Sequence, residues 1–236
     1  MPRLRVSRTK RNANKNAILF IIFWLAVTVE CVALFNRNYT VYGFSRIFLV
    51  PIILVRIFWL SNARKLSVYF YLFLLFSLLA DSFTIFGNEK IATLGLSFFT
   101  VSYLSIACYF LQLRDNHNKG HLIFLISAIV VASLYSLWLY SPEIHKQTFY
   151  SQIALHSLWL CFMVYSLLVS NPKIPAKPFG LFLLASLFIV LGNILYAVDA
   201  LYLNWRYAVL ESIIGLCNGF YLFLLTKGAL GSIKKI

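Results

Sequence analysis

Hydrophobic residues form long runs along the whole chain, and short polar segments separate one run from the next. A membrane-spanning helix needs about 20 apolar residues, because the hydrocarbon core of a bilayer is about 30 Å thick. Eight runs reach this length, approximately residues 17–35, 41–60, 66–86, 91–113, 121–140, 149–170, 179–203 and 207–226. They predict helices rather than barrel strands, which need only about 10 residues of alternating polarity.

The composition is that of an integral membrane protein. Of the 236 residues, 61% are hydrophobic and 12% are charged, and the mean hydropathy is +0.82. An ordinary soluble domain has about 45–50% apolar and about 25% charged residues. We therefore predict an all-α fold, a polytopic bundle of eight transmembrane helices in one domain at residues 17–228. A disordered basic arm at 1–16 precedes it, and a short basic tail at 229–236 follows it.

The net charge of +14 is explained by membrane topology rather than by nucleic acid binding. Fifteen of the 21 Lys and Arg residues lie in the two ends and in alternate loops on one side. Five lie on the other side, and Arg56 lies within the second span. Because cytoplasmic loops are rich in Lys and Arg, both termini are expected in the cytoplasm. A bacterial inner membrane is the expected location, and no nucleic acid partner is expected.

An acidic residue, Asp81, lies well inside the third span. Ser77, Asp81, Thr84 and Asn88 follow one another at helical spacing and would form one polar stripe. A carboxylate in a bilayer costs about 2.5–3.5 kcal/mol on insertion scales, so such a residue is functional by default. The alternative is a protonated Asp81 that is buried by packing and hydrogen-bonded to a neighbouring helix.

The seventh span carries a comparable polar face. Ser186, Asn193 and Tyr196 share it by helical spacing, and the segment around Asn193 (VLGNILYAV) resembles the segment around Asp81 (LLADSFTIF), 112 residues earlier. This similarity is compatible with a parallel four-plus-four repeat. If the two spans are equivalent, Asp81 and Asn193 lie at similar depth, and Asn193 could donate a hydrogen bond to Asp81.

Other polar residues have simpler interpretations. Ser102 lies on a polar face of the fourth span, where interhelical hydrogen bonds are a more economical explanation than catalysis. Glu30 and Glu211 lie near the outer ends of their spans and are expected to be solvated. His156 is a lone histidine, for which a structural role is the more frequent one. We expect neither a metal ion nor a cofactor, because the four cysteines lie in apolar runs without a CxxC pair.

Several residues resemble a known family. The third span reads Leu78-Leu79-Ala80-Asp81, and the fourth has a glycine followed by aromatic residues, Gly95 and Phe98. Together with eight spans and short loops, this pattern resembles the YhhN family of integral membrane proteins, whose characterised members are lysoplasmalogenases.

The resemblance is divergent at five points. The family has a Lys-Pro pair in its second span and another proline shortly after it. Here Arg46 stands for the lysine and Ile47 replaces the first proline, whereas Pro51 matches the later one. Ser102 replaces an expected histidine. Gly192 and Asn193 replace a Ser-Asp pair. In the eighth span, the Tyr-rich motif is reduced to Phe220-Tyr221, without the glutamine that should follow.

The resemblance implies hydrolysis of the vinyl ether of a lysoplasmalogen, which yields a fatty aldehyde and a glycerophospho-alcohol. That reaction needs an acid and a base. An apolar surrounding favours the protonated form of Asp81, which is therefore the candidate acid. Asn193 holds the other catalytic position but cannot take a proton from water. Arg46 is expected to bind a phosphate headgroup at the outer mouth, and Ser77, Ser102 and Tyr196 to line the substrate pocket.

Two other functions remain open. Loss of the second acid, the histidine and the glutamine favours a non-catalytic protein that binds a lipid or another amphiphile. The repeat would instead suit a small transporter, which predicts broken helices and a path open to each side in turn. A blind cavity beside Asp81 would favour a lysolipid hydrolase or binder, and a through-path would favour transport. The sequence leaves the exact substrate and the oligomeric state open.

Overall fold

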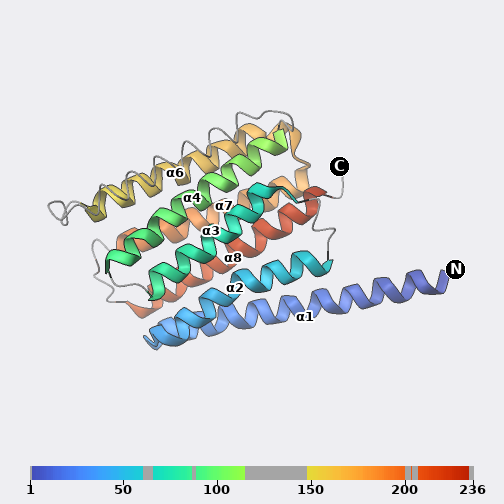
Figure 1. Ribbon diagram of the computed structural model, residues 1–236, viewed down its shortest axis with the longest axis horizontal. Coiled ribbons are helices and arrows are strands. Elements are labelled where there is room, and N and C mark those ends of the chain that lie inside the picture. Colours follow the sequence, from blue (N-terminus) through green and yellow to red (C-terminus); the bar gives the residue numbers. More distant parts are fainter. Residues whose placement is uncertain are drawn as a thin grey trace.

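The computed structural model describes residues 2–60, 66–86, 89–114, 148–199, 203 and 207–233. Within these ranges the regular elements are helices, and none of the described residues forms a strand (Figure 1). The elements are α1 (Pro2–Phe35), α2 (Tyr39–Leu60), α3 (Val68–Phe86), α4 (Glu89–Arg114), α6 (Thr148–Ser170), a short 3₁₀ turn (Asn171–Lys173), α7 (Ala176–Val198) and α8 (Ala208–Ser232).

Seven helices of the described part are long and apolar enough to cross a membrane. Their candidate spans have 18 to 25 residues and include nearly all of α2, α3, α7 and α8. The prediction of an all-helical, polytopic membrane bundle is thus confirmed. The fifth predicted span, 121–140, lies outside the described residues.

The first helix is longer than its membrane span. Its span covers Lys15–Phe35, yet the helix begins at Pro2, where a disordered arm is expected from the sequence. Pro2 is well placed to begin a helix, because a proline at the first helical position loses no hydrogen bond. Lys and Arg, which dominate the following residues, are good helix formers. In Figure 1 this basic end of α1 extends beyond the other helices.

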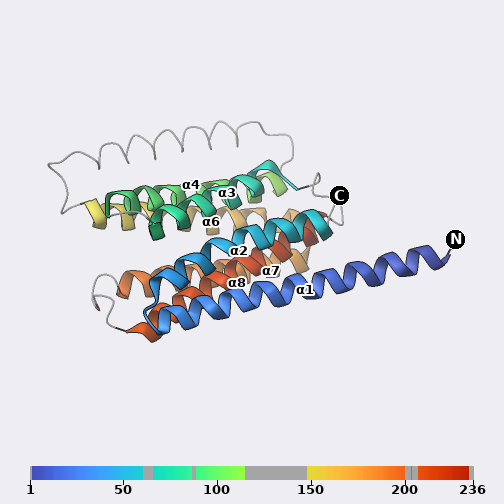
Figure 2. The same cartoon turned by 60° about the horizontal axis from the view of Figure 1, so that its bottom comes forward.

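The described helices pack as a closed ring. Each contacts its neighbour in the order α1, α2, α3, α4, α6, α7 and α8, and α8 returns to α1. Both termini lie at the same end of the bundle (Figure 1). Figures 1 and 2 also show that α4 and α6 run in the same direction, so the end of α4 and the beginning of α6 lie at opposite ends of the bundle.

Glycines allow close helix contacts at two seams of the ring. A Cβ atom at Gly219 of α8 would lie 2.8 Å from Val27 of α1. A Cβ atom at Gly95 of α4 would lie 2.9 Å from the carbonyl oxygen of Ala80 in α3. Small residues at such contacts are typical of membrane helices, whose association depends on close packing. These close contacts involve α1 and α3, which carry Glu30 and Asp81.

Candidate functional site

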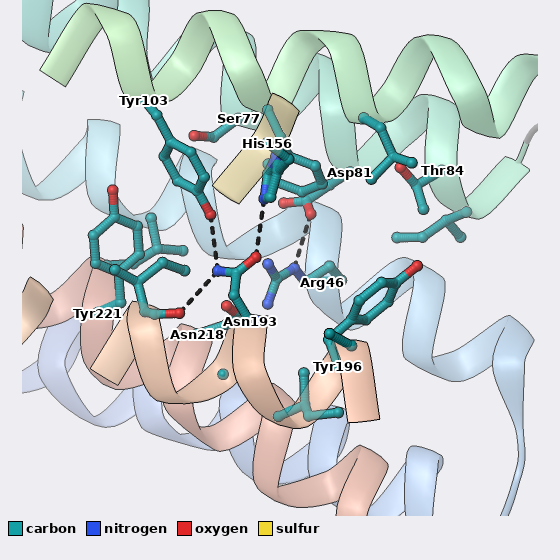
Figure 3. A pocket seen from close by; sticks show the side chains of 18 of the residues that line it. Arg46, Ser77, Asp81, Thr84, Tyr103, His156, Asn193, Tyr196, Asn218 and Tyr221 are labelled. Atoms are coloured by element: carbon teal, nitrogen blue, oxygen red, sulfur yellow. Dashed lines mark hydrogen bonds and ion pairs between the residues drawn. The ribbon is translucent and has the colours of Figure 1, made fainter. Parts of the chain in front are cut away.

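A cavity of about 160 Å³ lies inside the ring, between α2, α3, α4, α6, α7 and α8. Figure 3 shows it from close by. Its polar lining comes from Tyr42, Arg46, Ser77, Asp81, Thr84, Tyr103, His156, Ser157, Asn193, Tyr196, Asn218 and Tyr221. Apolar side chains, including Ile85, Leu96, Phe99, Ile189 and Leu222, complete the lining. Such a mixed lining suits an amphiphilic ligand.

Arg46 joins two acidic residues in the interior of the bundle. Its Nε lies 3.0 Å from Oδ1 of Asp81, and its Nη1 lies 3.1 Å from Oε1 of Glu30. The exposed fractions are 6% for Arg46, 5% for Asp81 and 0% for Glu30. Three charged side chains therefore share one buried site, which we call the Glu30–Arg46–Asp81 triad.

The triad follows from the way the first three helices are connected. Residues 36–38 join α1 to α2, so the two helices form an antiparallel hairpin in which Glu30 precedes the turn and Arg46 follows it. Asp81 lies near the end of α3, the next helix of the ring. Removing a charge from water is costly unless an opposite charge compensates it. One guanidinium faces two carboxyl groups here, so a proton on one carboxyl would make the triad neutral.

A second polar group lies on the side of α6 and α7. His156 Nε2 lies 2.9 Å from Oδ1 of Asn193. The Nδ2 of Asn193 donates to the Tyr103 hydroxyl at 3.2 Å and to the carbonyl oxygen of Ile189 at 2.8 Å. Figure 3 shows these bonds beside the Arg46–Asp81 pair. Because both amide hydrogens of Asn193 are used, its Oδ1 must accept, and Nε2 of His156 carries the donated hydrogen.

The predicted site residues meet in this cavity with one exception. Asp81, Asn193, Arg46, Ser77 and Tyr196 all line it. Ser102 does not line the cavity. Its hydroxyl lies 2.7 Å from that of Ser77 and donates to the carbonyl oxygen of Phe73 at 3.4 Å. Ser102 thus forms an interhelical contact behind the pocket wall.

The contacts of three residues in the structure differ from those that the sequence suggested. Asn193 bonds to His156, Tyr103 and Ile189, whereas the proposed equivalence of the two spans would have allowed a bond to Asp81. Arg46 is buried and paired with two carboxyl groups, where a headgroup site at the outer mouth was expected. Glu30 was expected to be solvated and is fully buried. In each case the chain itself supplies the charged or polar partner.

Glu211 is also more buried than the sequence suggested. It is 5% exposed and accepts a hydrogen bond from the Tyr39 hydroxyl at 3.4 Å. Its position near the end of the span is compatible with a solvated side chain. Burial follows from the packing of α8 against α1 and α2, which no single-helix pattern reveals.

Sequence reasoning missed Glu30, Tyr103 and His156 as parts of the site or its surroundings. The signal for Glu30 was present, because Glu30 and Arg46 are separated by 16 residues around a short turn. Opposite charges at similar depth in a hairpin of two apolar helices are expected to pair. Tyr103 and His156 gave no such signal, since their contact with Asn193 depends on how α4, α6 and α7 meet.

Among the described residues, no group of three or more His, Cys, Asp or Glu side chains could hold a metal ion. Comparison with known proteins adds no assignment: no family model, curated protein or solved structure matches the chain.

Proposed function

We propose that this protein is a membrane-embedded hydrolase of the YhhN type, which cleaves the vinyl ether of single-chain ether lipids. The observation that carries the proposal is the position of Asp81. Its carboxyl group is buried, is held by Arg46 and lines a cavity that has both polar and apolar walls. A lysoplasmalogen has one hydrocarbon chain and a polar end, and its vinyl ether lies where the two meet.

The triad supports Asp81 as the acid. With both carboxyl groups ionised it would carry a net negative charge away from water, and one bound proton removes that charge. Glu30 does not line the cavity, whereas Asp81 does. Asp81 is therefore the carboxyl from which a proton can pass to the vinyl carbon of the substrate. The charge that remains on the triad then faces the oxocarbenium ion and stabilises it.

Arg46 has a different role here from the one expected from the sequence. Two carboxyl groups already occupy its guanidinium, so it is a poor site for a phosphate headgroup. We assign to it the orientation of Asp81, since its Nε bonds to one oxygen of that carboxyl. The other oxygen remains available for the reacting proton.

The decisive experiment measures fatty aldehyde released from lysoplasmenylcholine by the purified protein in detergent. We expect release by the wild type and a loss of about 10²- to 10⁴-fold in kcat for Asp81→Asn, the usual range for removal of a general acid. Ser82→Ala is the matched control, because Ser82 bonds to the Leu78 carbonyl of its own helix. No aldehyde from the wild type, or unchanged release by Asp81→Asn, would refute the proposal.

A lipid or amphiphile binder without activity is the second candidate. It is favoured by Asn193, whose amide occupies the position of a second acid and has hydrogen bonds to three neighbouring groups. Mass spectrometry of lipids that co-purify with the protein distinguishes the two. A stoichiometric bound lysolipid without aldehyde release supports the binder. Transport of a labelled lysolipid across proteoliposomes would instead support the small transporter.

The proposal includes eight transmembrane helices, with both termini in the cytoplasm and the protein in a bacterial inner membrane. The parallel course of α4 and α6 supports an additional crossing by residues 115–147. The parallel four-plus-four repeat remains part of the same proposal. It is supported by the equivalent antiparallel pairs α3–α4 and α7–α8, which make the two most extensive helix contacts in the described part of the chain.

A further inference from the structure

Two features of His156 point to a role of this residue in the proposed reaction. It lines the same cavity as Asp81, and its Nδ1 is buried without a hydrogen-bond partner among the described residues. Buried polar atoms nearly always have a partner, so an exception calls for an explanation. A reacting molecule in the cavity would supply the missing partner.

We propose that His156 is the catalytic base of the hydrolysis, and that it takes a proton from the attacking water at Nδ1. This assignment rests on the function proposed above and fills its main gap. Vinyl ether hydrolysis needs an acid and a base, and Asn193 cannot be the base. Asn193 instead determines which nitrogen of His156 is free.

The hydrogen bonds of Asn193 decide the tautomer of the neutral imidazole. Its Nδ2 donates to the Tyr103 hydroxyl and to the Ile189 carbonyl, so its Oδ1 accepts from Nε2–H of His156. The lone pair of the neutral ring is then on Nδ1. In hydrolases with a histidine base, a third residue fixes the ring in the same manner. Asn193 is accordingly a positioning residue, and Tyr103 supports it.

The ring itself is held by aromatic neighbours. Its centre lies 4.8 Å from the ring centre of Tyr103 and 6.3 Å from that of Phe99, both on α4. These contacts restrict rotation of the imidazole and leave Nδ1 in a fixed position. A base that is held in one orientation loses little entropy when the substrate and water bind.

The proton transfers balance over the whole cycle. Protonated Asp81 gives its proton to the vinyl carbon and forms the oxocarbenium ion. Water adds to the cationic carbon while His156 Nδ1 takes one of its protons, which gives a hemiacetal. The hemiacetal then splits: the imidazolium returns its proton to the leaving alcohol oxygen, and Asp81 takes the hydroxyl proton. One water is consumed, the products are an aldehyde and an alcohol, and both residues regain their initial states.

The assignment predicts a pH profile with two limbs. His156 must be neutral, so kcat falls at acid pH, and Asp81 must be protonated, so kcat falls at alkaline pH. The other titratable groups of the cavity are Arg46 and Tyr42 from α2, Tyr103 from α4, Tyr196 from α7 and Tyr221 from α8. Arginine and tyrosine ordinarily titrate well above neutral pH. Glu30 of α1 does not line the cavity but shares Arg46 with Asp81, so its titration belongs to the triad. We therefore assign the acid limb to His156, and loss of that limb in His156→Gln checks the assignment.

The experiment compares kcat, KM and the pH profile of the wild type, His156→Gln and Asn193→Ala with lysoplasmenylcholine in detergent. We expect kcat to fall about 10²- to 10⁴-fold in His156→Gln, with loss of the acid limb. For Asn193→Ala we expect a loss of about 10- to 100-fold, because the ring is misplaced and not removed. Cys161→Ala, at an exposed position of the same helix, is the control with unchanged kcat.

Binding of the saturated alkyl-ether lysolipid, which cannot be hydrolysed, separates catalysis from folding. A His156→Gln protein that binds this analogue like the wild type but does not turn over supports the assignment. Wild-type kcat in His156→Gln overturns the assignment of the base and leaves the proposed function intact. Loss of both binding and turnover in this variant also overturns the assignment, because that result indicates a structural role for His156. If that variant does not fold, a wild-type profile without an acid limb overturns the assignment. A wild type that releases no aldehyde overturns both proposals.

Discussion

Arg46 and Asp81 are in direct contact between α2 and α3 inside the bundle, with 3.0 Å between Nε and Oδ1. Both side chains are almost fully enclosed, and the same guanidinium also binds Glu30 of α1. Three consecutive helices are thereby linked through one cationic group. The pair explains how an acidic residue is retained inside an apolar bundle, and it also determines what happens when one member is lost.

Removal of Arg46 alone should be strongly destabilising. Arg46→Met leaves two carboxyl groups buried without a counter-charge, and breaking such a pair from one side costs about 3–5 kcal/mol. The triple variant Glu30→Gln, Arg46→Met, Asp81→Asn removes every charged group of the triad and should be more stable than the single variant. The measurement is thermal unfolding in detergent at fixed protein concentration. A single variant as stable as the triple would show that the triad carries no buried charge.

Ser102 should affect stability and not substrate binding. Its hydroxyl is buried and bonds to Ser77 and to the Phe73 carbonyl, outside the cavity. Ser102→Ala should lower the free energy of unfolding by about 1 kcal/mol, the usual net value of a buried hydrogen bond, and should leave KM unchanged. If KM rises with no loss of stability, Ser102 contacts the substrate and our placement of the pocket wall is wrong.

The close contact of α1 and α8 can be tested at Gly219. A Cβ atom there would lie 2.8 and 2.9 Å from the two methyl groups of Val27. Overpacking of this kind costs about 1–3 kcal/mol, so Gly219→Ala should lower the unfolding temperature. Gly180→Ala in α7 is the matched control, because nothing lies within 4 Å of its added methyl group. The control should be neutral or slightly stabilising, since alanine favours helix more than glycine by about 1 kcal/mol.

The fold class and the seven membrane spans of the described residues could be predicted from the sequence because they depend on local composition. A run of about 20 apolar residues identifies a spanning helix without knowledge of its neighbours. The buried position of Asp81 follows similarly, because an ionisable residue inside an apolar span is expected to face the interior of the bundle and not the lipid. These inferences require no information on how the helices are arranged around one another.

The partners inside the site could not be predicted in this way. Asn193 was expected to face Asp81 because both lie at similar positions in their spans. Depth alone, however, does not fix the rotation of a helix or its neighbours in the ring. In the structure α6 places His156 within reach of Asn193, and α1 places Glu30 within reach of Arg46. A pairing between three or more helices depends on their common packing, which is not encoded in any one of them.

The parallel course of α4 and α6 predicts one further membrane crossing between them. The end of α4 and the beginning of α6 lie at opposite ends of the bundle (Figures 1 and 2), so the chain between them should cross the membrane once. Reporter fusions at residues 117 and 144 should therefore report opposite sides, with residue 117 in the cytoplasm. Fusions at the two termini serve as controls and should both be cytoplasmic, because Lys and Arg are concentrated on that side. If residues 117 and 144 report the same side, then 121–140 does not span the membrane, and the arrangement of eight transmembrane helices is wrong.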